Sequence, residues 1–270
     1  MDLLTILQQP FMQRALYGGL LIAILCAVIG IFITLKKQAF LSDAVAHASL
    51  SGVAIGILVS GQPLIFALIV GIFMAIAITY LQSHSKISID ALIGIIYSLL
   101  FALGVIIINL SPNYQPELFS YLFGSILAIT WEDLLFAAIV FMVTMVTISK
   151  VYKRLVYLTF DRESAQIRGI NVDALEYLIT ILSSITIIIS LKIIGLVLVT
   201  ALLIIPATTA KLLAKNFKQM LPLSILFSVI SIISGIILSF YLSTPTGATV
   251  VVVSASFFLA IFQLVKLFKR

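Results

Sequence analysis

Long apolar stretches fill most of this chain of 270 residues and constrain its fold more than any other feature. A helix needs about 20 predominantly apolar residues to cross the hydrocarbon core of a membrane. Stretches of this length follow one another with short polar breaks between them. We therefore predict about nine transmembrane helices, within a range of roughly eight to ten, at residues 15–35, 41–60, 63–82, 90–110, 132–149, 174–191, 193–213, 220–241 and 247–265.

The composition agrees with a membrane protein and excludes a soluble one. Hydrophobic residues make up 62% of the chain and charged residues 10%, against roughly 25% charged residues in soluble domains. The N-terminus lacks the basic start and cleavage site of a removable signal peptide, so we expect the first apolar stretch to stay in the bilayer. We predict an all-α, polytopic integral membrane protein with a single transmembrane domain over residues 1–270. Its one cysteine, Cys26, excludes an intrachain disulfide and a cysteine-rich metal site.

The basic residues indicate how the chain is oriented. If the loop with Lys36 and Lys37 is cytoplasmic, every Lys and Arg except Arg14 and Lys192 falls on the cytoplasmic side. This distribution follows the positive-inside rule and predicts the N-terminus outside and the C-terminus in the cytoplasm. The net charge of +6 therefore reports topology rather than nucleic-acid binding.

Two ionisable residues lie inside the second apolar stretch. Asp43 and His47 are four residues apart, so their side chains share one face of a helix. Ionisable residues inside membrane spans usually face the bundle interior and mark functional sites. An imidazole and a carboxylate at this spacing can bind Zn²⁺, Mn²⁺ or Fe²⁺, whereas Cu⁺ prefers sulfur. Two ligands are too few for a specific site, so a second copy of the chain would complete it.

Structural roles for the same residues remain open. Asp43 is a possible N-cap of the second span, with Ser42 as the alternative cap, and His47 can donate a hydrogen bond to a backbone carbonyl. The only other histidine, His84, lies at the end of a span and is expected to be solvated. Gly52 and Gly56 have the spacing that lets membrane helices pack closely.

The longest polar stretch begins at residue 150 and extends to about residue 173. Asp161 can cap a short helix that continues through Glu163 and Ala165, and Gly169 would terminate it. The next helix would then begin at Asn171 or Asp173. Such a helix suits docking to a cytoplasmic protein, but a loop of this length also forms helical turns for no further reason.

The chain has no sequence motif for ATP hydrolysis. It contains no Gly-x-x-x-x-Gly-Lys-[Ser/Thr] loop and no evident nucleophile–base pair, so we do not expect an enzyme. Energy for transport would come from a partner chain or from an ion gradient.

Four segments in order resemble the membrane permease subunit of bacterial manganese, zinc and iron ABC importers, the ABC-3 family. They are FLSDAVAHASLSGVAIG, FDRESAQIRGINV, GLVLVTALLIIPATTAKLL and TPTGATVVVVSASFF. The resemblance covers nearly the whole chain. One departure is Ser51, where many relatives have proline.

The resemblance implies a type II-like importer fold in the bacterial cytoplasmic membrane. It implies a homodimer, two cytoplasmic ATPase subunits and an extracytoplasmic metal-binding protein, with transported Mn²⁺, Zn²⁺ or Fe²⁺ and no permanently bound cofactor. It places Asp43 and His47 in the metal pathway. Pro206 is likewise a family feature, and because proline frees a backbone carbonyl one turn earlier, we expect it to kink the seventh span. The residues that it assigns to coupling with the ATPase are Asp161, Arg162, Glu163, Ala165, Arg168, Gly169 and Ile170.

Two other functions remain open as alternatives to an ABC importer of bare ions. One is a gradient-driven secondary transporter or channel, which needs no ATPase. The other is an ABC permease for a metal chelate, against which an intramembrane His–Asp pair argues because it suits a bare ion.

Overall fold

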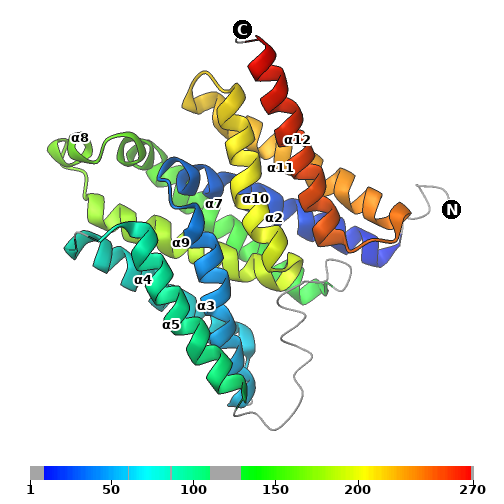
Figure 1. Cartoon of the computed structure of the whole chain (residues 1–270), viewed down its shortest axis with the longest axis horizontal. Coiled ribbons are helices and arrows are strands. Elements are labelled where there is room, and N and C mark those ends of the chain that lie inside the picture. The colour runs from blue at the N-terminus through cyan, green and yellow to red at the C-terminus, as the bar shows by residue number, and fades with distance from the viewer. Residues whose placement is uncertain (1–8, 60, 86, 110–128, 269–270) are drawn as a thin grey trace.

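The computed structural model describes residues 9–59, 61–85, 87–109 and 129–268 (Figure 1). Within these ranges the protein is built from helices. Their bounds are α2 (Pro10–Leu35), α3 (Ala39–Leu58), α4 (Pro63–His84), α5 (Ile89–Asn109), α7 (Trp131–Phe160), α8 (Arg162–Ile167), α9 (Val172–Ile194), α10 (Leu196–Leu213), α11 (Phe217–Leu242) and α12 (Thr246–Phe268).

The predicted number of spans is confirmed for the described part of the chain. There, all of these helices except α8 are long and apolar enough to cross a membrane, which makes nine. Several boundaries differ from the prediction, among them the start of α2 at Pro10 rather than residue 15 and the start of α3 at Ala39 rather than residue 41. Helix α7 does not stop at residue 149 but runs on to Phe160, because the basic residues that follow end the membrane span and not the helix. The predicted break at residue 192 lies instead at Gly195, which alone separates α9 from α10.

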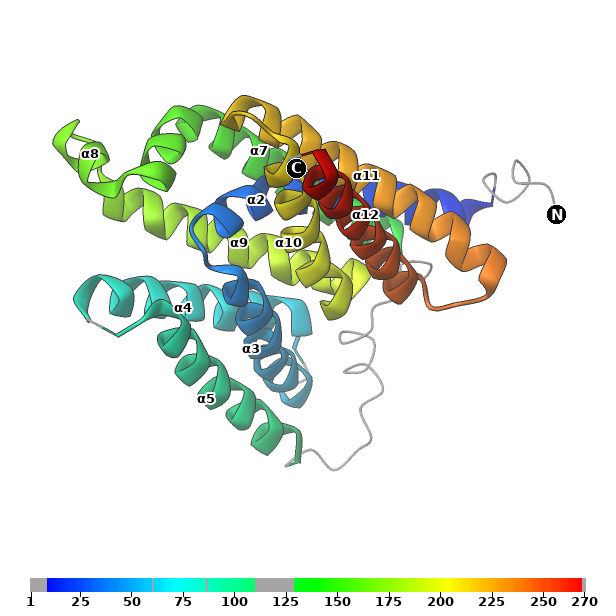
Figure 2. The ribbon, with the colours of Figure 1, turned by 45° about the horizontal axis from the view of Figure 1, so that its top comes forward.

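Helix α9 occupies the centre of the bundle. It contacts α2, α3, α4, α7, α8 and α10. Helices α3, α4 and α5 pack together on one side of it, and α2, α10, α11 and α12 pack together on the other (Figures 1 and 2). The helix that carries Asp43 and His47, α3, packs against both α4 and α5 and also contacts the central helix α9.

Polar side chains also join helices inside the bundle. Ser224 and Ser228 of α11 donate hydrogen bonds to the carbonyls of Ala27 and Ala23 on α2. Cys26 is fully buried beside Ser190, with 3.8 Å between Sγ and Oγ. Such contacts are typical of membrane helices, which associate without a hydrophobic driving force.

Candidate metal site and cytoplasmic segment

Helix α3 begins before Asp43, and this excludes Asp43 as a helix cap. Its N-cap residue is Gln38, which makes no side-chain capping bond. Ser42, the alternative cap, donates instead to the carbonyl of Ala39 within the first turn. Asp43 is thus a residue of the helix body. Both capping interpretations are wrong, because the helix starts directly after the turn at the end of α2.

Asp43 and His47 meet on one face of α3. The Nδ1 atom of His47 lies 2.9 Å from the backbone oxygen of Asp43 and 3.6 Å from its carboxylate Oδ1. Since a carbonyl oxygen only accepts hydrogen bonds, Nδ1 carries the proton and donates it. In the neutral ring this leaves the lone pair on Nε2 as the ligand atom that His47 offers to a metal. The bond to a backbone carbonyl, expected as the structural role of His47, therefore forms and fixes the orientation of the ring.

Two aromatic side chains of α5 surround the histidine. The rings of Tyr97 and Phe101 lie edge-on to the imidazole, at 5.3 Å and 5.9 Å between centroids. Edge-on packing is a favoured geometry for such rings. Residues 97 and 101 are one turn apart, so a single face of α5 holds His47 in place.

The pair is open on one side. The side chain of Asp43 is 50% exposed and that of His47 is 22% exposed. Among the residues that the structure describes, no group of three or more His, Cys, Asp or Glu residues comes together. Asp43 and His47 therefore offer one oxygen ligand group and one nitrogen ligand, and further ligands would have to come from outside this part of the chain.

The two glycines singled out on α3 face α4. A Cβ atom added at Gly52 would lie 2.5 Å from the backbone oxygen of Phe66, and one at Gly56 would lie 2.7 Å from the Cα of Pro63. Both distances are shorter than real Cβ contacts. The backbones of α3 and α4 thus touch at these positions within one chain.

The short helix predicted between Asp161 and Gly169 forms as α8. The Asp161 side chain accepts from the amide of Ser164, Gly169 has a φ of +73°, and the Asn171 side chain caps α9 by accepting from the amide of Ala174. Hydrogen bonds from the hydroxyl and amide of Ser164 lower the pKa of Asp161. The last residue of α8, Ile167, is 87% exposed. An exposed apolar side chain on a short capped helix is well placed to contact another protein.

An ion-pair network joins α8 to the membrane helices, and the sequence reading missed its central residue, Glu176. One carboxylate oxygen of Glu176 lies 3.6 Å from Nζ of Lys36, and the other lies 3.4 Å from Nη2 of Arg162. Arg162 also contacts Asp173 at 3.1 Å. The only sequence signal was an acidic residue placed just inside the apolar stretch of α9, three residues after Asp173.

At Pro206 helix α10 continues without interruption. Proline lacks an amide hydrogen, so the carbonyl of Leu202 loses its helical donor. The hydroxyls of Thr208 and Thr209 donate to carbonyls of their own helix, those of Ile204 and Ile205, at 2.7 Å each. These hydroxyls are therefore turned onto the helix backbone. The kink itself stays a prediction.

A second cluster of charges lies at the opposite ends of the helices. Nζ of Lys192 is 2.6 Å from Oδ1 of Asp133, and Asp133 also forms the capping box of α7 with Thr130. Glu132, Asp133 and Lys192 line a cavity of about 290 Å³ with apolar residues of α4, α7 and α9. Lys192, one of the two basic residues predicted away from the cytoplasm, is thus neutralised by a carboxylate.

Comparison with known proteins places this geometry among transporters. The sequence model described as ABC 3 transport family matches residues 8–265. A high-affinity zinc uptake system membrane protein, ZnuB of Haemophilus influenzae, is 36% identical over 256 residues, which cover 95% of this chain and 96% of ZnuB. A manganese transport system membrane protein, MntC of Halalkalibacterium halodurans, is 36% identical over 94% of this chain and 87% of its own length.

Solved structures agree with these relatives. PsaBC from Streptococcus pneumoniae, solved in complex with a Fab, superposes with a TM-score of 0.84 and 32% identity, over 94% of this chain and 92% of the matched chain. An inward-facing structure of a putative metal-chelate type ABC transporter superposes with a TM-score of 0.75 at 18% identity, over 93% of this chain and 85% of the other. The second match supports the fold alone.

Proposed function

The chain belongs to the ABC 3 transport family, and we propose that it is the membrane permease subunit of an ATP-driven importer of divalent transition-metal ions, namely manganese, zinc or iron. Its relatives are named for zinc and manganese transport. It is a multi-pass membrane protein and a transport subunit, and ATP is hydrolysed by a separate ATPase chain. The family membership disfavours the gradient-driven alternative.

The observation that carries the proposal is the arrangement of Asp43 and His47. The Nδ1 proton of His47 is held by a backbone carbonyl, and Nε2 remains available beside a half-exposed carboxylate. This nitrogen and oxygen set suits Mn²⁺, Zn²⁺ and Fe²⁺. The metal is the cargo, so the pair acts as a transient binding point in the pathway.

A second copy of the chain would complete this binding point. The described residues supply one aspartate and one histidine to the site, and a twofold axis beside α3 and α5 would double this to two of each. The exposed side of Asp43 and the exposed ring of Phe101 support such a homodimer.

We assign the contact with the ATPase to the segment around α8. Its members are Asp161, Arg162, Glu163, Ala165, Arg168, Gly169 and Ile170. Asp161 and Gly169 fix the two ends of the helix, and Arg168 lies over the ring of Tyr157 at 4.7 Å, which holds the segment against the end of α7. Ala165 is buried against the protein, so the opposite side of α8 is free for the partner.

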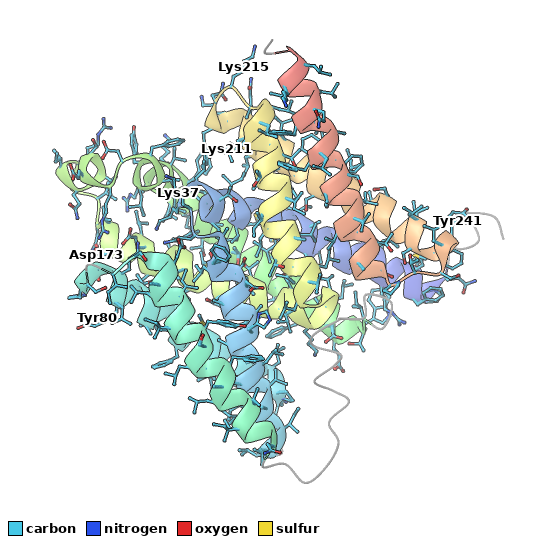
Figure 3. All side chains as sticks on the ribbon, in the orientation of Figure 1. Lys37, Tyr80, Asp173, Lys211, Lys215 and Tyr241 are labelled. Carbon is cyan, nitrogen blue, oxygen red and sulfur yellow. The ribbon has the colours of Figure 1, made fainter. Side chains whose placement is uncertain are left out.

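The charge distribution supports an orientation with the N-terminus outside and the C-terminus in the cytoplasm. Lys37, Lys211 and Lys215 lie at helix ends on the same side of the molecule as Asp173, and Tyr241 lies at the opposite end (Figure 3). This side also carries α8, so the positive-inside rule and the proposed ATPase contact agree.

The proposed mechanism is alternating access. An extracytoplasmic metal-binding protein delivers the ion to the outer side, the ion passes Asp43 and His47, and motion driven by ATP opens the pathway to the cytoplasm. The bound ion replaces its lost water ligands with the carboxylate and imidazole as it crosses the bilayer.

The test is metal uptake by the complete complex in proteoliposomes, with Mn²⁺, Zn²⁺ and Fe²⁺ in competition. The variants are Asp43→Ala and His47→Ala, and the matched control is His84→Ala, because His84 is exposed at the end of α4. We expect uptake to be lost in the first two variants and kept in the control. Uptake that persists in both pathway variants, in complexes that assemble normally, would refute the assignment. The competition identifies the physiological metal.

A further inference from the structure

We propose that Glu176 is a positioning residue for transport, which ties α8 to the turn between α2 and α3 and so transmits motion of α8 to the helix that carries Asp43 and His47. This proposal rests on the function proposed above. Glu176 contacts neither the metal pair nor the exposed surface of α8, so its role would be to connect them.

Glu176 bridges the end of α2 and the start of α8. Its two carboxylate oxygens have different partners, Lys36 at the end of α2 and Arg162 at the start of α8. One carboxylate thereby links residues that are far apart in the sequence. Arg162 also pairs with Asp173 of α9, so it links α8 to α9 at two carboxylates.

The half of this bridge that joins Glu176 to Lys36 is buried, whereas Arg162 is 40% exposed. The side chains of Glu176 and Lys36 are 8% and 12% exposed. Burial lowers the pKa of Lys36, and the attraction of Glu176 opposes that shift. Separating Glu176 from Lys36 would leave a buried charge without compensation. We therefore expect the two residues to stay together as the helices move. An exposed pair would instead exchange freely with water.

The turn that joins Lys36 to α3 is short and has a fixed conformation. Lys36 is the C-cap of α2, and its amide donates to the carbonyl of Phe32. Lys37 has a φ of 57°, and α3 begins at Ala39. Asp43 follows within about one helical turn of that start. A displacement of Lys36 should therefore move the start of α3 by a similar amount.

The test must separate coupling from stability. We choose Glu176→Gln, which keeps the shape of the side chain, and the double variant Glu176→Gln with Lys36→Met, which removes both buried charges. Replacing both partners of a buried pair is often neutral for stability, whereas removing one is destabilising. The control is Asp173→Asn, because Asp173 also contacts Arg162 but is 65% exposed and does not reach Lys36.

The first measurement is the number of metal ions moved per ATP hydrolysed, in proteoliposomes with the complete complex. We expect both variants to bind the ATPase and hydrolyse ATP, with the metal moved per ATP reduced by about fivefold or more, the lower end of typical coupling between sites. The double variant should recover the melting temperature of the wild type and stay uncoupled. A wild-type ratio in the double variant would overturn the proposal and leave Glu176 a stabilising residue.

The second measurement does not depend on transport. Amide hydrogen exchange of residues 36–47 and 161–170 is compared with and without the ATPase and ATP. We expect both segments to respond in the wild type and only 161–170 to respond in Glu176→Gln. An unchanged response of 36–47 in that variant, or no response there in the wild type, would overturn the proposal. If the wild type responds but moves no metal ion, the proposed function fails and the link through Glu176 stands.

Discussion

The contact between α3 and α4 at Gly52 makes a prediction whose size follows from the coordinates. In Gly52→Ala the new Cβ would lie 2.5 Å from the carbonyl oxygen of Phe66 and 2.7 Å from the Cα of Ala67. These are backbone atoms, so no side-chain rotation relieves the overlap. The two helices would have to separate by roughly 0.7 to 0.9 Å before ordinary van der Waals contact returned.

The matched control is Gly94→Ala on α5, where an added Cβ has no atom within 4 Å. Both substitutions gain the same helix propensity, up to about 1 kcal/mol. Their difference therefore isolates the overlap, for which overpacking costs about 1–3 kcal/mol. At about 2–4 °C per kcal/mol, Gly52→Ala should melt about 2–12 °C below Gly94→Ala.

The assay is thermal unfolding of the two purified variants and the wild type in the same detergent and at the same scan rate, which controls for irreversible unfolding. Metal uptake by the assembled complex should also fall in Gly52→Ala, because the displaced helix carries Asp43 and His47. If Gly52→Ala and Gly94→Ala melt within about 1 °C of each other, the close approach of α3 and α4 does not exist as described and the reasoning is refuted.

Further predictions concern the two ends of the bundle. Asp161→Ala should weaken binding of the ATPase because it uncaps α8, while Asp161→Asn should keep binding, since asparagine caps equally well; equal binding constants for the two variants would contradict this. The pKa of Asp161 is lowered in the folded protein, so the stabilisation from its charge is present above the unfolded pKa and is lost only as pH falls below that value. Binding of the ATPase should therefore show no titration by this group from about pH 6 to 8. Ile167→Asp should reduce ATPase binding and leave the melting temperature of the free subunit unchanged, because the side chain touches little within the chain; a lower melting temperature would show that it packs internally. Lys192→Met should lower the melting temperature, because Asp133 loses its partner at 2.6 Å, and Lys192→Met combined with Asp133→Asn should recover part of the loss; a single variant as stable as the wild type would show that the pair contributes nothing.

The membrane spans and the two ends of α8 could be predicted from sequence because each depends on neighbouring residues. A run of about 20 apolar residues identifies a membrane helix without any knowledge of its neighbours. In the same way, Asp161 and Gly169 define the ends of α8 through contacts a few residues away. The pairing of Asp43 with His47 likewise needed only the period of a helix.

Contacts between distant segments were not predictable in this way. Nothing in the sequence pairs Glu176 with Lys36 or Lys192 with Asp133, because these contacts depend on how the helices pack. The start of α3 was also placed too late. It depends on the turn at Lys37, whose positive φ follows no local rule for lysine.

Gly195 has a consequence for the sidedness of the whole C-terminal part of the chain. Helices α9 and α10 have 23 and 18 residues, and end to end they would measure about 60 Å, roughly twice the hydrocarbon thickness of a bilayer. The chain turns back at one residue, whose φ of 81° and ψ of 164° belong to a region essentially reserved for glycine. No loop separates the two spans, so the reversal that sends α10 back across the membrane requires a residue at position 195 that adopts this conformation, which glycine does without steric strain.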